Sequence, residues 1–253
     1  MSEPAIIARL KGHAKRFLPP TAVRQLNRLR RRLEPIPVGS VRFGDFKRTS
    51  PISDCYGWDR GTPVDRYYLE SFLSKHASDI RGRVLEITDD RYTRRFGTDV
   101  VQSDILDIDK SNPRATFVGD VELRATLPES TFDCIIFAQT LQYLYDLPNG
   151  IANLHRALKP GGVVLLTAGG LSQLSYTYEA KWYWWITPDG LRRLLEERFG
   201  PNSVWVKGFG NVYAAASFFH GLAIEELEQT ALNFEDSKYP VVVVGRAVKK
   251  LDQ

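Results

Sequence analysis

Short, nearly continuous apolar runs recur along most of the chain, and the segments between them place apolar residues at helical spacing. Continuous apolar runs are typical of strands that are covered on both faces of a sheet. The predicted strands span residues 83–87, 99–105, 115–120, 132–139, 163–169, 204–210 and 240–248. Helical spacing predicts helices over residues 63–78 and 148–158, and another that begins at Thr187-Pro188. Alternating strands and helices indicate parallel βαβ units, so we expect an α/β fold with a doubly wound sheet.

The first 33 residues have a different pattern. They contain nine basic residues and one acidic residue, a local charge of +8, whereas the whole chain carries a net charge of +4. Apolar residues at helical spacing predict two short amphipathic helices, over residues 5–18 and 21–33. Such an arm can lie on an anionic lipid surface, or it can pack as solvated helices on its own domain or on a partner. We expect a basic helical arm and linker over residues 1–50 and one domain over residues 51–253.

Composition excludes several classes of protein. Apolar residues make up 43% of the chain and charged residues 25%, which argues against wholesale disorder. No apolar run approaches the roughly 18 residues of a membrane-spanning helix, and the two cysteines and four histidines show no metal-ligand spacing. Residues 34–253 carry 25 basic and 29 acidic groups, which is not typical of a nucleic-acid-binding surface. We expect a cytoplasmic protein without metal or nucleic acid, with peripheral membrane contact through residues 1–33 as an option.

Acidic residues follow or end the first three predicted strands. Doubly wound sheets bind ligands at the carboxyl ends of their strands, where Glu86, Asp104 and Asp120 are expected. Asp104 comes 18 residues after Glu86, close to the interval that places an acid beside a bound ribose. Asp107 and Asp109 compete for this role, and the apparent end of the apolar run favours Asp104. An acid after the third strand can accept a hydrogen bond from the amine of adenine, so the three acids indicate a nucleoside-type ligand.

Four stretches carry a resemblance to a known family. RGRVLEI, VGDVELRATLPESTFDCIIFAQTLQYLYDL, LHRALKPGGVVLLTAGG and WITPDGLRRLLEERFG lie in this order between residues 81 and 200. They resemble the class I S-adenosylmethionine-dependent methyltransferases. The resemblance implies a Rossmann-like fold with a seven-stranded, mostly parallel sheet whose last strand is antiparallel, and S-adenosylmethionine as cofactor. The segment before the first strand also looks like that of methyltransferases linked to bacterial glycan gene clusters.

The resemblance also implies roles for individual residues. It maps Glu86 to the acid of the first strand, Asp104 to the ribose, Asp120 to the adenine and Gln139 to the methionine part of the cofactor. The first loop, beginning with Thr88, departs from the family's E-x-G-x-G-x-G pattern. The residues at its three glycine positions are Thr88, Asp90 and Tyr92. Glycine admits close backbone approach and positive φ, so either the loop follows another path or cofactor binding is weakened or lost.

Two functions remain open at this point. One is a methyltransferase that acts on a small-molecule or glycan acceptor, for which a sugar hydroxyl is one choice. The other is a catalytically silent scaffold of a glycan-assembly complex, which the altered first loop favours. A nicotinamide-dependent oxidoreductase is disfavoured because its glycine fingerprint is absent.

The candidates for acceptor chemistry are few. His220 follows an aromatic stretch and is a weak candidate for a catalytic base. Arg94 and Arg95 follow the first loop and can hold an anionic acceptor or remain a solvated pair. Aromatic residues after the fifth strand can form an acceptor site or a packed lid, and at least one of the tryptophans is expected to be exposed or at an interface. These aromatic residues are Tyr176, Tyr178, Trp182, Tyr183, Trp184 and Trp185.

Overall fold

The structure is a computed structural model, and it describes residues 36–174 and 181–251. The chain divides into two units, Met1–Ser50 and Pro51–Gln253. In the first unit the described residues, 36–50, contain one short 3-10 turn, η1 (Gly44–Phe46), and mostly exposed side chains. The helices predicted over 5–18 and 21–33 lie outside the described residues. None of the helices in the described ranges is long and apolar enough to cross a membrane.

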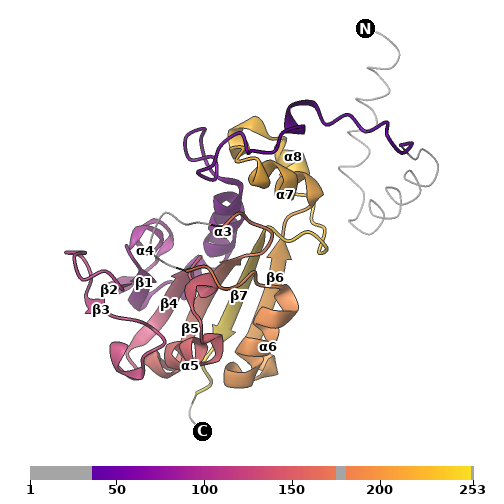
Figure 1. Cartoon of the computed structure of the whole chain (residues 1–253). Coiled ribbons are helices and arrows are strands. Elements are labelled where there is room, and N and C mark those ends of the chain that lie inside the picture. Colours follow the sequence, from indigo (N-terminus) through magenta and orange to yellow (C-terminus); the bar gives the residue numbers. More distant parts are fainter. Residues whose placement is uncertain (1–35, 175–180, 252–253) are drawn as a thin grey trace. The chain divides into compact units, whose positions relative to one another are not determined.

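A seven-stranded sheet forms the centre of the second unit (Figure 1). The strands are β1 (Gly82–Ile87), β2 (Val100–Asp107), β3 (Phe117–Val118), β4 (Phe132–Ala138), β5 (Leu158–Gly169), β6 (Val204–Phe209) and β7 (Val242–Val248). Their order across the sheet is β3-β2-β1-β4-β5-β7-β6. Neighbouring strands are parallel, except that β7 runs antiparallel to β5 and β6. This confirms the predicted fold class, with its antiparallel last strand.

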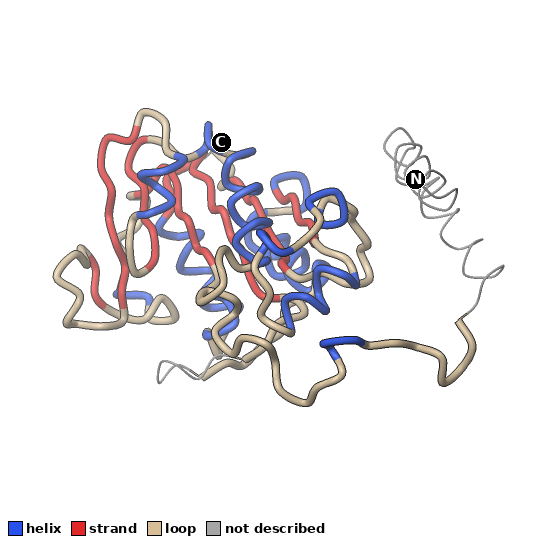
Figure 2. Tube along the Cα trace, turned by 90° about the horizontal axis from the view of Figure 1, so that it is seen from above, coloured by secondary structure: helices blue, strands red, loops and turns tan. Residues whose placement is uncertain are grey.

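Helices cover both faces of this sheet, as the two core clusters show. The α-helices are α3 (Val64–Lys75), α4 (Arg91–Phe96), α5 (Leu147–Ala157), α6 (Pro188–Phe199), α7 (Val212–Phe219) and α8 (Gln229–Leu232). Short 3-10 turns are η2 (Ala77–Asp79), η3 (Arg124–Thr126), η4 (Leu141–Tyr143), η5 (Pro201–Ser203) and η6 (Ile224–Glu226). One core cluster joins the sheet to α5 and α6, and the other joins it to α3, α4 and α7. Figure 2 shows the row of strands with helices beside it.

Local sequence explains where α6 begins and ends. The Thr187 hydroxyl accepts a hydrogen bond from the Gly190 N–H at 3.1 Å, and Pro188 occupies the first helical position. At the other end, Gly200 has a φ of +81° and ends the helix, a conformation that glycine adopts without strain. The helix lies where the sequence predicts one.

Several strands differ from their predicted boundaries, most of all β5, which begins at Leu158 instead of residue 163. β2 continues to Asp107, two residues beyond the predicted end at 105, and β3 has only two residues, Phe117 and Val118. The expectation that Asp104 lies at the end of the second strand is therefore wrong. Asp104 pairs with Leu85 across β1 and β2, inside the sheet. Its carboxylate is 2% exposed and accepts a hydrogen bond from Arg83 at 2.7 Å, which compensates its burial.

Candidate cofactor site

The carboxyl ends of β1, β2 and β4 lie side by side at one edge of the sheet. Ile87 pairs with Leu106, the residue before Asp107, and Glu86 pairs with Ile136 in β4. The loops that follow these strands therefore meet at this edge, where open α/β sheets bind their ligands.

Glu86 fixes the end of the first loop through hydrogen bonds to its side chain. Its buried carboxylate accepts hydrogen bonds from the Tyr92 N–H at 3.0 Å, the Thr93 N–H at 2.7 Å and the Thr93 hydroxyl at 2.8 Å. Burial raises the pKa of Glu86 to about 7, although these hydrogen bonds act in the opposite direction. Glu86 thus fixes the first turn of α4, and with it the path of the loop.

The three positions where the family has glycine take different conformations. Thr88 has a φ of +67°, a left-handed conformation that a β-branched residue adopts only with strain. Asp90, with a φ of −111°, precedes α4 directly, and Tyr92 lies within the helix with a buried ring. The Tyr92 hydroxyl accepts a hydrogen bond from Arg66 at 3.0 Å. Positive φ is therefore required at Thr88 alone, so Tyr92 occupies its position without backbone strain.

Asp107 lies at the end of β2, in the place where Asp104 was expected. It is 9% exposed, and its carboxylate accepts hydrogen bonds from the Asp109 N–H at 2.9 Å and the Asn112 amide at 2.7 Å. The same Asn112 amide donates to the Thr88 carbonyl at 2.8 Å and so ties the first loop to the end of β2. Sequence reasoning names Asp107 only as a competitor and misses Asn112, which no periodic pattern marks.

Two large apolar side chains are exposed near the acids at this edge. Ile108, directly after Asp107, is 73% exposed, and Leu123, three residues after Asp120, is 62% exposed. The Asp120 carboxylate accepts a hydrogen bond from the Glu122 N–H at 2.8 Å in a tight turn. Exposed apolar groups beside such acids suit a flat heterocycle with polar edges.

The end of β4 presents buried polar atoms without partners. Gln139 has a φ of +49°, and its N–H donates to the Thr167 carbonyl at 2.8 Å and to the Thr167 hydroxyl at 3.0 Å. Within the described ranges, the Gln139 amide nitrogen, the Gln142 amide oxygen and one oxygen of Asp65, in the first turn of α3, have no hydrogen-bond partner. Unsatisfied buried polar atoms are costly, so the donor of Gln139 and the acceptor of Gln142, three residues apart after β4, fit a polar ligand such as the amino-acid end of S-adenosylmethionine.

Tyr183 and Trp184, in the described part of the aromatic segment after β5, contact the residues that follow β4. The Trp184 indole donates to the Leu144 carbonyl at 2.7 Å, and the Tyr183 N–H donates to the Gln142 carbonyl at 2.8 Å. Trp185 is nevertheless 58% exposed, which confirms that at least one of the tryptophans faces outward. Tyr176 and Tyr178 lie outside the described residues.

The remaining candidates take structural contacts. His220 ends α7, and its carbonyl accepts the N–H groups of Ile52 and Ser53 from the loop before α3, at 3.0 and 3.1 Å. Arg94 forms an ion pair with Asp90 at 3.1 Å and Arg95 with Glu70 at 2.6 Å. No group of three or more possible metal ligands occurs in the part of the chain that the structure describes.

Comparisons with known proteins agree with this geometry. Residues 79–166 match a family model described as a methyltransferase domain. The malonyl-[acyl-carrier protein] O-methyltransferase of Serratia marcescens is 35% identical over 65 residues, which are 24% of this chain and 25% of that protein. The match thus spans about a quarter of the length of this curated relative.

Several solved structures share the fold. Phosphoethanolamine N-methyltransferase 2 of Haemonchus contortus, in complex with S-adenosyl-L-methionine, has a TM-score of 0.51 and 19% identity over 85% of this chain and 61% of that one. An S-adenosylmethionine-dependent methyltransferase from Mesorhizobium loti has a TM-score of 0.50 and 16% identity over 76% and 100%. The [4+2]-cyclase SpnF also has a TM-score of 0.50, with 13% identity over 76% and 84%. Its presence shows that the fold alone does not specify methyl transfer.

The family match, over residues 79–166, includes the acid, glutamine and first-loop positions described above. The same residues form the first strands of the sheet, whose order is β3-β2-β1-β4-β5-β7-β6. The second unit therefore has the fold of solved S-adenosylmethionine-dependent methyltransferases, and residues 79–166 within it are similar to a methyltransferase domain.

Proposed function

We propose that the protein binds S-adenosylmethionine at the carboxyl edge of β1, β2 and β4 and transfers its methyl group to a small polar acceptor. The observation that carries this proposal is the set of polar atoms at this edge: the Asp107 carboxylate, held by Asn112, and the partnerless side-chain atoms of Gln139 and Gln142. A scaffold without a ligand has no need to keep such atoms buried.

Different residues of this edge bind different parts of S-adenosylmethionine. Asp107 is positioned to accept hydrogen bonds from ribose hydroxyls, in place of Asp104. Ile108 and Leu123 offer apolar contact to the adenine, and Asp120 accepts from its amine. Gln139 and Gln142 hold the amino-acid end, while Glu86, whose carboxylate accepts from Tyr92, and Thr88 shape the loop.

The cofactor supplies an activated methyl group on a positively charged sulfur. The chain must then hold the acceptor in line with it, exclude water and, for a hydroxyl acceptor, remove a proton. A sugar hydroxyl is the acceptor that we propose, because Tyr183, Trp184 and Trp185 expose aromatic rings that can stack on the apolar face of a sugar. His220 is the proposed base, because its carbonyl accepts hydrogen bonds from Ile52 and Ser53 and the next residue, Asp54, accepts one from Gln173 in the segment after β5.

Calorimetric titration with S-adenosylmethionine and S-adenosylhomocysteine tests the cofactor part of this proposal. Binding of both ligands supports the proposed enzyme activity. At a ligand concentration of about 100 times the dissociation constant, the free energy of unfolding should rise by about 2.7 kcal/mol. No heat and no thermal shift at millimolar ligand would favour the alternative, a silent scaffold of a glycan-assembly complex. The acceptor is tested separately by methyl transfer from labelled cofactor to sugars that differ in their free hydroxyls, in wild type and His220→Ala.

A further inference from the structure

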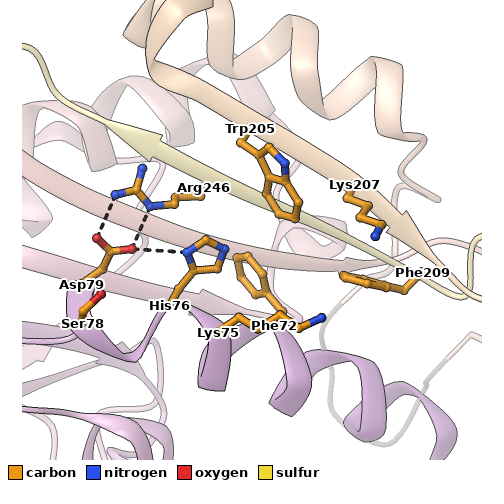
Figure 3. A pocket seen from close by; sticks show the side chains of 9 residues that line it. All are labelled: Phe72, Lys75, His76, Ser78, Asp79, Trp205, Lys207, Phe209 and Arg246. Atoms are coloured by element: carbon orange, nitrogen blue, oxygen red, sulfur yellow. Dashed lines mark hydrogen bonds and ion pairs between the residues drawn. The ribbon is translucent and has the colours of Figure 1, made fainter. Parts of the chain in front are cut away.

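A second pocket lies away from the cofactor edge. It has a volume of about 560 Å³ and is bounded by α3, the turn η2 and the strands β6 and β7 (Figure 3). Trp205, Lys207 and Phe209 alternate along β6, so all three side chains project from the face of the sheet that α3 covers. The volume lies within the range of small-molecule sites. The cofactor residues lie instead at the ends of β1, β2 and β4.

One side of the pocket is a stack of aromatic rings. The Trp205 indole lies nearly parallel to the Phe72 ring, with centroids 6.1 Å apart and an interplanar angle of 8°. The His76 ring lies against both, at 4.9 Å from Phe72 and 5.6 Å from Trp205. Phe72 is 1% exposed, whereas Trp205 on the edge strand β6 is 42% exposed. The buried ring therefore supports an accessible one, which can stack against a flat ligand.

The other side of the pocket carries amines. The ammonium groups of Lys75 and Lys207 lie 5.8 and 4.8 Å from the centroid of the Phe209 ring. Lys207 also forms an ion pair with Glu235 at 2.8 Å. No carboxylate of the described residues lies within ion-pair distance of Lys75. Lys75 therefore keeps an uncompensated positive charge beside an apolar ring.

The remaining charges of the pocket compensate one another. Asp79 accepts two hydrogen bonds from the Arg246 guanidinium, at 2.7 and 2.8 Å, and lies 3.4 Å from the Nδ1 atom of His76 (Figure 3). This pairing holds Arg246 and His76 in place at one end of the pocket. Because Glu235 already pairs with Lys207, the positive charge available to a ligand is that of Lys75.

We propose that this pocket binds a flat ring that carries an anionic group, the chemistry shared by nucleotides and aromatic carboxylates. The ring stacks on Trp205, and the anionic group binds the ammonium group of Lys75. Both features are needed, because an exposed lysine attracts anions only weakly in physiological salt and an exposed tryptophan alone has little selectivity.

Titration of the full-length chain tests this assignment. The protein is first mixed with excess S-adenosylhomocysteine, so that the cofactor edge does not compete, and is then titrated with AMP, adenosine, inorganic phosphate, benzoate or naphthoate. We expect AMP or an aromatic carboxylate to bind at least about tenfold more tightly than adenosine and phosphate, a difference of about 1.4 kcal/mol. Tight binding of AMP identifies the nucleotide class, and tight binding of benzoate or naphthoate identifies the carboxylate class.

Variants localise the binding. Lys75→Gln is expected to remove the preference for the charged ligand. Trp205→Ala is expected to weaken the binding of ring-bearing ligands at least about tenfold. Trp205→Phe keeps part of the stack, so it remains informative if Trp205→Ala loses its fold. Lys250→Gln removes an exposed lysine outside the pocket and is the matched control, without effect on binding. Absence of binding at millimolar ligand, or binding that neither Lys75→Gln nor Trp205→Phe changes, overturns the proposal.

Discussion

At the scale of single residues, the cofactor proposal depends most on Asp107. A carboxylate that accepts hydroxyl hydrogen bonds contributes about 1.5–3 kcal/mol for each. Asp107→Ala is therefore expected to weaken S-adenosylhomocysteine binding at least about tenfold, since about 1.4 kcal/mol is a factor of ten. Asp107→Asn should lose less affinity, because its amide oxygen still accepts a hydrogen bond. Calorimetric titration measures the dissociation constants of both variants.

Asp104→Asn is the matched control for this test. Asp104 lies inside the sheet and pairs with Arg83, so the variant is expected to lower the unfolding midpoint with a smaller effect on the ligand. A larger loss of affinity in Asp104→Asn than in Asp107→Asn would contradict the assignment.

Glu86 carries a prediction about pH. Burial raises its folded pKa to about 7 from the ordinary 4.5, so the folded state binds the proton more tightly than the unfolded chain. Its contribution to stability is largest below about pH 4.5, decreases as the pH rises and is lost above about pH 7. The free-energy difference of unfolding between wild type and Glu86→Gln should therefore shift by about 3 kcal/mol across this range. Denaturant titrations at several pH values measure it, and parallel curves for the two proteins would refute it.

At the scale of elements, the first loop stores strain at Thr88. A left-handed conformation costs an L-residue about 1–2 kcal/mol, and glycine adopts it freely but loses about 0.5–1 kcal/mol of chain entropy. Thr88→Gly is expected to stabilise the protein by up to about 1 kcal/mol. Thr98, which lacks a positive φ, is the control, and Thr98→Gly should destabilise. The unfolding midpoints of both variants, measured by thermal unfolding, test this prediction. A lower midpoint for Thr88→Gly than for wild type would show that threonine is favourable at this position.

The order of elements follows from the sequence, whereas several strand ends, among them that of β2, do not. Strands covered on both faces have continuous apolar runs, as in β4 and in β5 from residue 163 onward, and these stretches are predicted correctly, whereas the polar start of β5 at residues 158–162 is missed. In β2 the first residues are largely exposed and the last four, from Asp104 to Asp107, are buried. A buried acid neutralised by Arg83, 21 positions earlier, interrupts the apolar run and resembles a strand end. Pairing between distant residues, such as Asn112 with Thr88, leaves no periodic signal, so it becomes visible only in the structure.

At the scale of the whole molecule, the positive charge of the chain is concentrated in residues 1–33, outside the domain that contains the sheet. Residues 34–253 carry a net −4 and residues 1–33 a net +8. A domain with mildly negative charge gains no attraction to anionic lipid from its own average charge. Any recruitment to such a surface must therefore come from the basic arm, which makes it separable from cofactor binding.

Membrane recruitment through residues 1–33 is the prediction at this scale. Each basic group near an anionic surface contributes about 1 kcal/mol, and the attraction is screened beyond a Debye length of about 8 Å in physiological salt. Full-length protein should therefore sediment with phosphatidylserine vesicles and be released as salt rises, whereas a chain lacking residues 1–33 should remain in the supernatant. Replacing Arg30, Arg31 and Arg32 by glutamine in the full chain should weaken binding without changing the unfolding midpoint. Equal sedimentation of all three proteins would refute a role of residues 1–33 in this recruitment.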